Sequence, residues 1–236
     1  MILVGRFGSR LAAAAAVLAF ASTSQANLLT NGSFEMGVNP PVSPPFAVIS
    51  TGDNATLTGW TVGGAAGVDW LQSGYWQASQ GDYSLDLNAL DAGSVSQTFA
   101  TTAGNTYSVT YDLSLNPDTN LGFPPNRSAL VTATNTDDNS VIGSLAHSFA
   151  FNSVGSTLAN MNWTPYGFSF TATGSQTTLT FASTNSEAGG VALDNVSVLD
   201  TNEPNPIPAP AGLLLGLLGV GIAARFRRRN VAVAAE

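Results

Sequence analysis

The sequence predicts an all-β protein folded as a jelly-roll β-sandwich. The central part of the chain is rich in Thr, Ser, Gly, Val and Phe and poor in strong helix formers. Its apolar residues alternate with polar ones over short stretches, as they do in half-buried strands. Clusters of Gly, Asn, Asp and Pro separate these stretches. Many short strands with no convincing helix between them are typical of sandwiches.

The clearest strand is expected at residues 107–115, where Tyr107, Val109, Tyr111 and Leu113 alternate with polar residues. Further strands are expected at residues 83–87, 95–99, 130–134, 168–172, 179–181 and 191–199. The residues around His147 also have the pattern of a strand, with no nucleophile elbow nearby, so we expect no catalytic histidine. Residues 39–45 and 116–126 contain Pro and Asn and are expected to be loops.

The last expected strand contains an irregularity in its alternation. Val191 and Leu193 lie on one phase of the alternation, whereas Val196 and Val198 lie on the other. A β-bulge at Asp194 would produce this slip of one residue, because a bulge inserts one extra residue into a strand. The bulge would also point Asp194 away from bulk solvent.

The first 26 residues have the pattern of a secretory signal peptide. Arg6 and Arg10 precede an apolar core at residues 11–21, and small residues stand at Ser24 and Ala26. We expect signal peptidase to cleave after Ala26. The alternative is an uncleaved anchor helix, which the shortness of the apolar run disfavours.

The C-terminal residues have the pattern of a sorting tail. Residues 201–210 form a Pro-rich linker, residues 211–229 combine a short apolar span with an Arg cluster, and residues 230–236 follow as a cytoplasmic tail. The positive-inside rule keeps the Arg cluster on the cytoplasmic side, so the expected transmembrane helix holds the chain at the inner membrane in transit. The residues of the motif are Pro206, Pro208, Pro210, Arg225, Arg227, Arg228 and Arg229.

This tail resembles the PEP-CTERM sorting signals, in a variant whose Glu203 and Pro204 precede the Pro-Ile-Pro segment. The resemblance implies processing by exosortase in a Gram-negative bacterium that forms exopolysaccharide and biofilm. It also implies a final location at the cell surface or in the extracellular matrix. Because the motif departs from the usual triplet, the cleavage site stays open.

Composition restricts the partners of the central domain. All of the 15 acidic residues except Glu236 lie between Glu35 and Glu203, whereas Arg127 is the only basic residue of that stretch besides His147. So acidic a surface repels nucleic acid and anionic membranes, and it suits either calcium or plain solubility. The chain has no cysteine, which excludes thiol catalysis and disulfides.

The order of short motifs along residues 27–200 resembles the choice-of-anchor C domain. The motifs are Asn31 to Glu35, Gly59-Trp60, Val68 to Trp70, Tyr75 to Gln77, Gly81 to Leu87, Gly93 to Phe99, Gly104 to Tyr107, Trp163, Phe168 to Ala172 and Ala192 to Val196. The resemblance implies a galactose-binding-like jelly roll that binds carbohydrate. It also implies that Glu35 and Asp194 hold a structural calcium ion, Ca2+, with backbone carbonyl groups. Alternatively, these two carboxylates cap turns or accept hydrogen bonds from backbone amides.

The candidate ligand-binding residues are Asp69, Tyr75, Trp76 and Gln77, because they lie together in a Gly-rich stretch. Aromatic rings can pack on the apolar face of a sugar, and Tyr75 and Trp76 could form such a platform, but buried packing is the favoured role for Trp70 and Trp76. Trp60 and Trp163 lie beside expected strands and are expected in the core.

We therefore expect a secreted, exosortase-processed matrix protein that binds polysaccharide without catalysis. A purely structural biofilm protein with no specific ligand is the first alternative. The second is a glycoside hydrolase that uses two of the carboxylates Asp69, Asp82 and Asp86. Asp86 is expected on a polar, solvated strand face, which disfavours this alternative.

Overall fold

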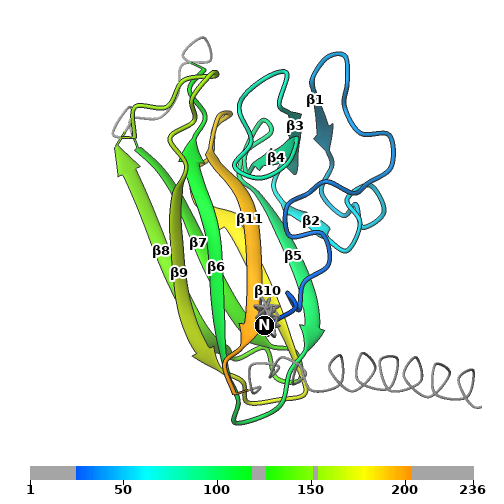
Figure 1. Ribbon diagram of the computed structural model, residues 1–236, viewed down its shortest axis with the longest axis vertical. Coiled ribbons are helices and arrows are strands. Elements are labelled where there is room, and N and C mark those ends of the chain that lie inside the picture. Colours follow the sequence, from blue (N-terminus) through cyan, green and yellow to red (C-terminus); the bar gives the residue numbers. More distant parts are fainter. Residues whose placement is uncertain (1–24, 119–125, 151–153, 203–236) are drawn as a thin grey trace, which may run out of the picture. The chain divides into compact units, whose positions relative to one another are not determined.

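The computed structural model describes residues 25–118, 126–150 and 154–202, which form two antiparallel sheets (Figure 1). The six-stranded sheet has the order β1-β3-β4-β11-β6-β9, and the five-stranded sheet has the order β2-β5-β10-β7-β8. The strands are β1 (Phe46–Ile49), β2 (Thr61–Gly64), β3 (Val68–Gln72), β4 (Tyr83–Asp86), β5 (Gly93–Ala100), β6 (Thr106–Leu115), β7 (Asn126–Asn135), β8 (Val141–Ala150), β9 (Thr164–Thr171), β10 (Gln176–Ser183) and β11 (Val191–Asp200). The expected all-β sandwich is confirmed for these residues.

All described residues except Gln25 belong to one compact unit, Ala26–Pro204. Residues 1–24 of the expected signal peptide and the sorting tail from Glu203 onward lie outside the described residues. Within the described ranges, no helix is long and apolar enough to span a membrane.

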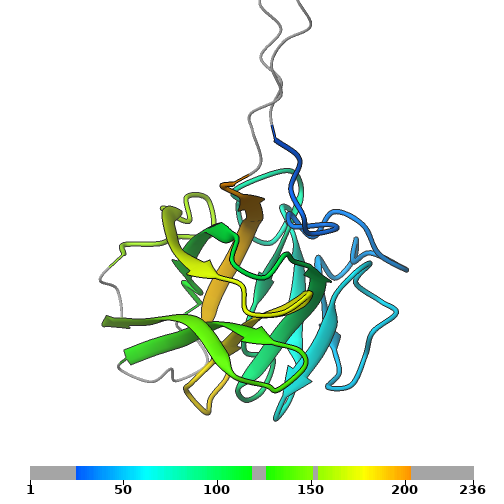
Figure 2. The ribbon, with the colours of Figure 1, turned by 90° about the horizontal axis from the view of Figure 1, so that it is seen from below.

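The two sheets pack face to face (Figure 2). An aromatic and aliphatic core lies between them. Trp60, Trp70, Tyr111 and Phe181 are at most 1% exposed, and Tyr111 of β6 packs edge-on against Phe181 of β10 in the opposite sheet. The alternation expected at residues 107–115 is confirmed, since Tyr107 and the apolar residues that follow it at every second position are buried. Burial of this much apolar surface is the main stabilising contribution in a domain without disulfides.

The expected bulge in β11 is also confirmed. The register between β11 and β6 shifts between Asp194 and Ser197, and Asn195 has a φ of 53°. Asp194 is fully buried on the outer side of the sheet. The phase slip in the sequence therefore predicted both the bulge and the unusual position of its carboxylate.

Candidate functional site

The outer face of the six-stranded sheet is covered rather than solvated. Trp76 packs there with Leu71, Met161 and Ala192 in a second, smaller apolar cluster, and its Nε1 donates a hydrogen bond to the Ser84 hydroxyl at 2.7 Å. Segments from the β3–β4 and β8–β9 connections supply these covering residues. The charged side chains on this face are consequently partly or fully removed from water.

A groove of about 410 Å3 opens beside this covered region, at the end of the sheet formed by β1 and β3. Its walls are largely apolar: Phe46, Val48 and Leu90 are 38%, 52% and 77% exposed. The lining residues are Phe46, Val48, Asp69, Leu71, Tyr75, Ala89, Leu90, Asn116, Asp118, Ala188 and Gly189. Pockets of this size with apolar walls and a few polar groups are typical of small-molecule or saccharide sites.

Phe46 and Tyr75 supply the aromatic side of the groove. Their ring centroids are 5.6 Å apart at an interplanar angle of 62°. The Tyr75 hydroxyl donates a hydrogen bond to Asp118 at 3.1 Å, and burial followed by the charge of Asp118 raises the pKa of Tyr75 to about 12. Tyr75 is therefore held as a neutral phenol with a fixed ring orientation.

Asp69 provides a carboxyl group in the same groove. Its Oδ1 is buried without a hydrogen-bond partner among the described residues. Burial, and then repulsion by the neighbouring Asp86, raises the pKa of Asp69 to about 7. Because Asp69 lines the groove, its desolvated carboxyl group is suited to accept hydrogen bonds from a ligand.

Asp86 lies directly opposite Asp69 in the β3–β4 register, but it has a different role. It is fully buried, so the expectation of a solvated position was wrong. Its Oδ1 accepts hydrogen bonds from the amides of Asn88 and Gly190, and its Oδ2 accepts one from the Asn116 side chain. Burial raises its pKa to about 6 despite these bonds. Asp86 therefore ties together the three loops that line the rim of the groove.

Two of the four expected ligand-binding residues, Asp69 and Tyr75, do line the groove. Trp76 does not, because its ring is fully buried in the cluster against the sheet; this is the packing role that the sequence favoured, and Trp76 is not a ligand-binding residue. Gln77 also lies outside the lining; its side-chain oxygen accepts a hydrogen bond from the Met161 amide at 3.3 Å. Gln77 and Trp76 thus hold the covering segments together.

Sequence reasoning missed Phe46, Asn116 and Asp118 as groove residues. Phe46 starts a four-residue strand directly after Pro44 and Pro45, in a run too short to show alternation. The available signal in the sequence was an aromatic residue, Phe46, at the start of a short apolar run directly after two prolines. Asn116 and Asp118 reach the groove through the fold alone, from a connection expected only to be a loop.

Glu35 and Asp194 bind one loop from two sides. Asp194 Oδ2 accepts hydrogen bonds from the amides of Ser79 and Gln80, both at 2.8 Å. Glu35 Oε1 accepts them from the amides of Asp82 and Tyr83, at 2.9 and 2.8 Å. We call residues 79–83 with these two carboxylates the loop clamp. The alternative role considered for the pair, as acceptors of backbone amides, is thus present in the structure.

The centre of the loop clamp must be glycine. Gly81 has a φ of +69°, and a Cβ placed there would lie 2.4 Å from the Glu35 carboxyl carbon. A left-handed backbone and this close approach both disfavour any larger residue. Gly81, the only glycine among residues 79–83, thus stands where the Glu35 carboxylate comes closest to the loop backbone.

The loop clamp also has the donor chemistry for a calcium ion. Burial, and to a smaller extent the charge of Glu35, raises the pKa of Asp194 to about 7 against the opposing effect of the amide hydrogen bonds, so the two carboxylates interact. No group of three or more His, Cys, Asp or Glu that could hold a metal exists among the described residues. A calcium ion here would take its other oxygens from backbone carbonyls and water, which calcium accepts. Calcium binding by Glu35 and Asp194 remains a prediction.

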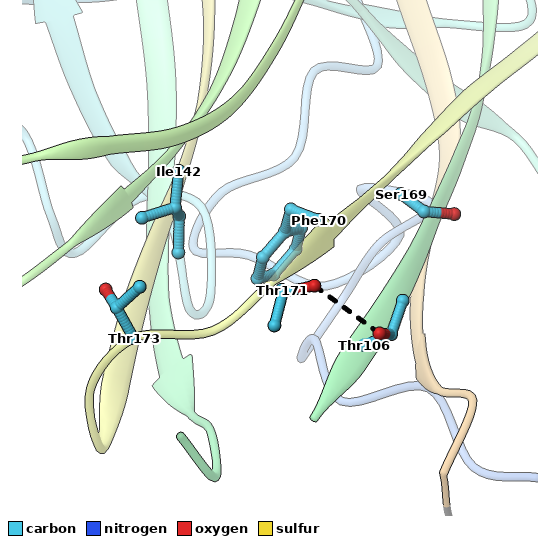
Figure 3. Close-up of a pocket in the computed structure, with 6 residues that line it drawn as sticks. All are labelled: Thr106, Ile142, Ser169, Phe170, Thr171 and Thr173. Atoms are coloured by element: carbon cyan, nitrogen blue, oxygen red, sulfur yellow. Dashed lines mark hydrogen bonds between the residues drawn. The ribbon is translucent and has the colours of Figure 1, made fainter. Parts of the chain in front are cut away.

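A second hollow of about 410 Å3 lies where β6, β9 and the start of β8 meet. Figure 3 shows Ile142 and Phe170 beside it, with the hydroxyl groups of Thr106 and Thr171 3.5 Å apart. Its described lining residues offer only hydroxyl and apolar groups. Because none of them is titratable or an exposed aromatic residue, this hollow offers less for recognition than the groove.

The fold and its groove define a class: antiparallel β-sandwiches with an aromatic and acidic groove on the outer face of one sheet. Over residues 27–199 the chain matches the DUF642 family, described as a protein of unknown function, and it belongs to that family. It is also 29% identical over 192 residues to halomucin from Haloquadratum walsbyi. That match covers 80% of this chain and only 2% of halomucin.

Several solved structures have a distantly similar fold. The carbohydrate-binding module TmCBM61 in complex with β-1,4-galactotriose is 13% identical, with a TM-score of 0.48 over 74% of this chain and 99% of that one. The xylan-binding domain CBM22-1 of Paenibacillus barcinonensis Xyn10C is 16% identical, with a TM-score of 0.47 over 78% and 100%. Likenesses at these scores carry no ligand to this chain, so the functional argument rests on the groove itself.

Proposed function

We propose that the groove beside β1 and β3 binds a stretch of polysaccharide without catalysis. The observation that carries the proposal is the pairing of two accessible rings, Phe46 and Tyr75, with the desolvated Asp69 carboxyl group in one groove. A ring face packs against the apolar C–H face of a sugar, while a carboxylate accepts hydrogen bonds from its hydroxyl groups. Among the described residues that line the groove, none has a basic side chain, which favours neutral sugars over uronic acids.

A glycan array with the compact unit, residues 26–204, tests this proposal, followed by calorimetry on the best ligand. Phe46→Ala and Tyr75→Ala should each weaken binding about tenfold or more, because aromatic anchors dominate binding energy. Leu158→Ala is the matched control, since Leu158 is exposed but lies outside the groove. Retention of no glycan, or equal loss in the control, would overturn the proposal.

The non-catalytic part of the proposal is supported by Asp86. A two-carboxylate hydrolase needs both acids accessible to the sugar, whereas both Asp86 oxygens are engaged in holding loops. Incubation with the bound glycan should release no reducing ends. Turnover that disappears in Asp69→Asn would establish the enzyme alternative instead.

We further propose that the protein is exported and sorted to the cell surface or matrix, on the strength of its terminal sequence patterns. Signal peptidase would remove residues 1–26, and exosortase would act near Pro206 to Pro210. Mass spectrometry of the surface-released protein should find a chain that starts at Asn27 and lacks the Arg cluster. A released chain that retains Arg227 to Arg229 would contradict the sorting proposal.

A further inference from the structure

The four strands that end the two sheets differ in how they are protected. β1 and β2 have four residues each, β1 follows Pro44 and Pro45, and β2 contains Gly63 and Gly64. β9 contains Pro165, which has no backbone donor. β8, in contrast, has ten residues with no proline and no Asp, Glu, Lys or Arg. Natural proteins blunt edge strands by shortness, proline, charge or bulges. β8 has only a bulge near its start, where its register with β7 shifts opposite Ala133 and Thr134, and its residues from Gly143 to Ala150 pair without a shift.

The outer edge of β8 takes no strand partner among the described residues. β8 pairs with β7 on one side only, and Figure 1 shows it at the outside of the sandwich. On the opposite side from β7, its amides and carbonyls form no backbone hydrogen bond with a described residue. Such an edge is a template for another extended strand.

The charge distribution favours a second copy of this chain as that strand. The exposed side chains of β8 are small and uncharged, namely Ser144, Ala146 and Ser148 with Val141 and Ala150. Their cross-strand neighbours on β7 are uncharged as well, at Thr132, Leu130 and Ser128. Two copies of this acidic body repel each other, but contact through β8 brings no carboxylates opposite each other within the paired strands.

We propose that two copies pair through their β8 strands, antiparallel and about a two-fold axis, so that the two five-stranded sheets become one continuous sheet. The contact is isologous, because each β8 presents the same edge to the other. The exposed acids of the preceding turn, Asp137 and Asp138, then lie at opposite ends of the paired strands and do not meet.

Pairing through β8 would make the protein bivalent, a consequence that rests on the proposed function. β8 lies beside β9, with His147 packed 4.6 Å from Tyr166, and β9 is the opposite end of the six-stranded sheet from β1. The groove at β1 is therefore far from the paired edge in each copy. A pair would present two outward grooves and could link two polysaccharide chains.

Sedimentation velocity across a concentration series of residues 26–204 tests the pairing directly. The area of a single strand pair is small, so we expect a weak dimer with a dissociation constant of roughly micromolar order or above. Ser144→Asp with Ser148→Asp, and separately Ser144→Lys with Ser148→Lys, should each weaken dimerisation about tenfold or more, because like charges face each other across the strands. A mixture of the two variants should restore the dimer through opposite charges.

Thr98→Asp with Ala100→Asp, on the same outer sheet face but on β5, is the matched control and should leave dimerisation unchanged. Circular dichroism and melting should confirm that every variant is folded. A wild-type chain that stays monomeric up to about millimolar concentration would overturn the proposal. So would a dimer that the β8 charges do not alter, or a mixture that fails to pair. None of these outcomes depends on whether a glycan binds.

Discussion

The groove and the loop clamp both place carboxylates on the outer face of the six-stranded sheet, but the hydrogen bonding of these carboxylates differs. In the loop clamp, Asp194 accepts two loop amides and its neighbour Glu35 accepts two more. In the groove, Asp69 keeps a buried oxygen without a described partner. A buried polar group without a partner costs stability, so its persistence points to a ligand, whereas a saturated one points to structure. Removing each carboxylate in turn and measuring the free energy of unfolding tests this distinction.

Removing a saturated carboxylate should have the largest effect. Asp194→Ala and Asp86→Ala should each lower the free energy of unfolding by about 3 kcal/mol or more, because buried amides lose their acceptor. Asp69→Ala should change it by about 1 kcal/mol at most, or raise it, since no described donor is orphaned. Urea denaturation measures all three. Equal destabilisation by Asp69→Ala and Asp194→Ala would remove the distinction.

Calcium should sharpen the comparison, because only the loop clamp should respond to it. At about 100 times its dissociation constant, calcium should add about 2.7 kcal/mol of stability and raise the melting temperature. The double variant Glu35→Gln, Asp194→Asn should lose this response, whereas Asp69→Asn should keep it. An unchanged melting temperature of the wild-type unit with calcium and with chelator would contradict the metal prediction.

The glycine of the loop clamp should come next in size. Gly81→Ala should cost about 1–3 kcal/mol, since it combines a positive φ with a clash against Glu35. Gly104→Ala is the matched control: its φ is +88°, but nothing lies within 4 Å of the added Cβ. It should cost only the backbone strain. The losses of stability in the two variants, measured by thermal melting, should therefore differ only by the cost of the clash with Glu35. Equal losses would contradict the close packing at Gly81.

In chelator, stability should fall as pH rises through the acidic range. Burial raises the pKa values of Asp69 and Asp194 from 3.8 to about 7, so the folded state binds more protons than the unfolded state between these values. Stability should decrease from about pH 4 to pH 7 and level off above, by up to about 1.4 kcal/mol per pH unit for each group. Asp194→Asn should flatten part of the slope. Melting temperatures that increase from pH 5 to pH 7 would contradict it.

The smallest effect should concern sugar selectivity. Asp69→Asn should weaken binding of a neutral glycan only a few-fold, since an amide oxygen still accepts hydrogen bonds. It should raise relative binding of a uronic acid polymer, because one negative charge leaves the groove. Parallel titrations with a neutral glycan and its uronic acid counterpart measure the ratio. A ratio unchanged by the variant would show that Asp69 does not set selectivity.

The periodicity of the sequence predicted those features of the fold that depend on the residue pattern within a single strand. The alternation around Tyr111 and the phase slip at Asp194 both correspond to what the structure shows. Asp86 was misplaced because alternation assumes that the second face of a strand meets water. Here loops that carry Asn88, Asn116 and Gly190 enclose Asp86, and such long-range covering leaves no periodic signal.

Only some of the groove residues could be predicted, because the others meet through long-range contacts. Asp69 and Tyr75 are close in sequence, so a local motif could suggest them. Phe46 and Asp118 come from distant segments that only strand order brings together. Their joint position depends on the pairing of β1 with β3 and on the loop after β6, which no single stretch of sequence encodes.

The place of β11 within its sheet has a mechanical consequence. β11 lies between β4 and β6, and β4 in turn pairs with β3, which carries Asp69. For a chain held by its C-terminal end, a pull on ligand in the groove would pass from β3 through β4 into β11, along hydrogen bonds of one sheet. The Asn27 side chain binds the backbone of Val196 and Val198, so the first described residues also brace the loaded strand. Tension would thus load the hydrogen bonds between β3, β4 and β11 in shear, and it would not pull the two sheets apart.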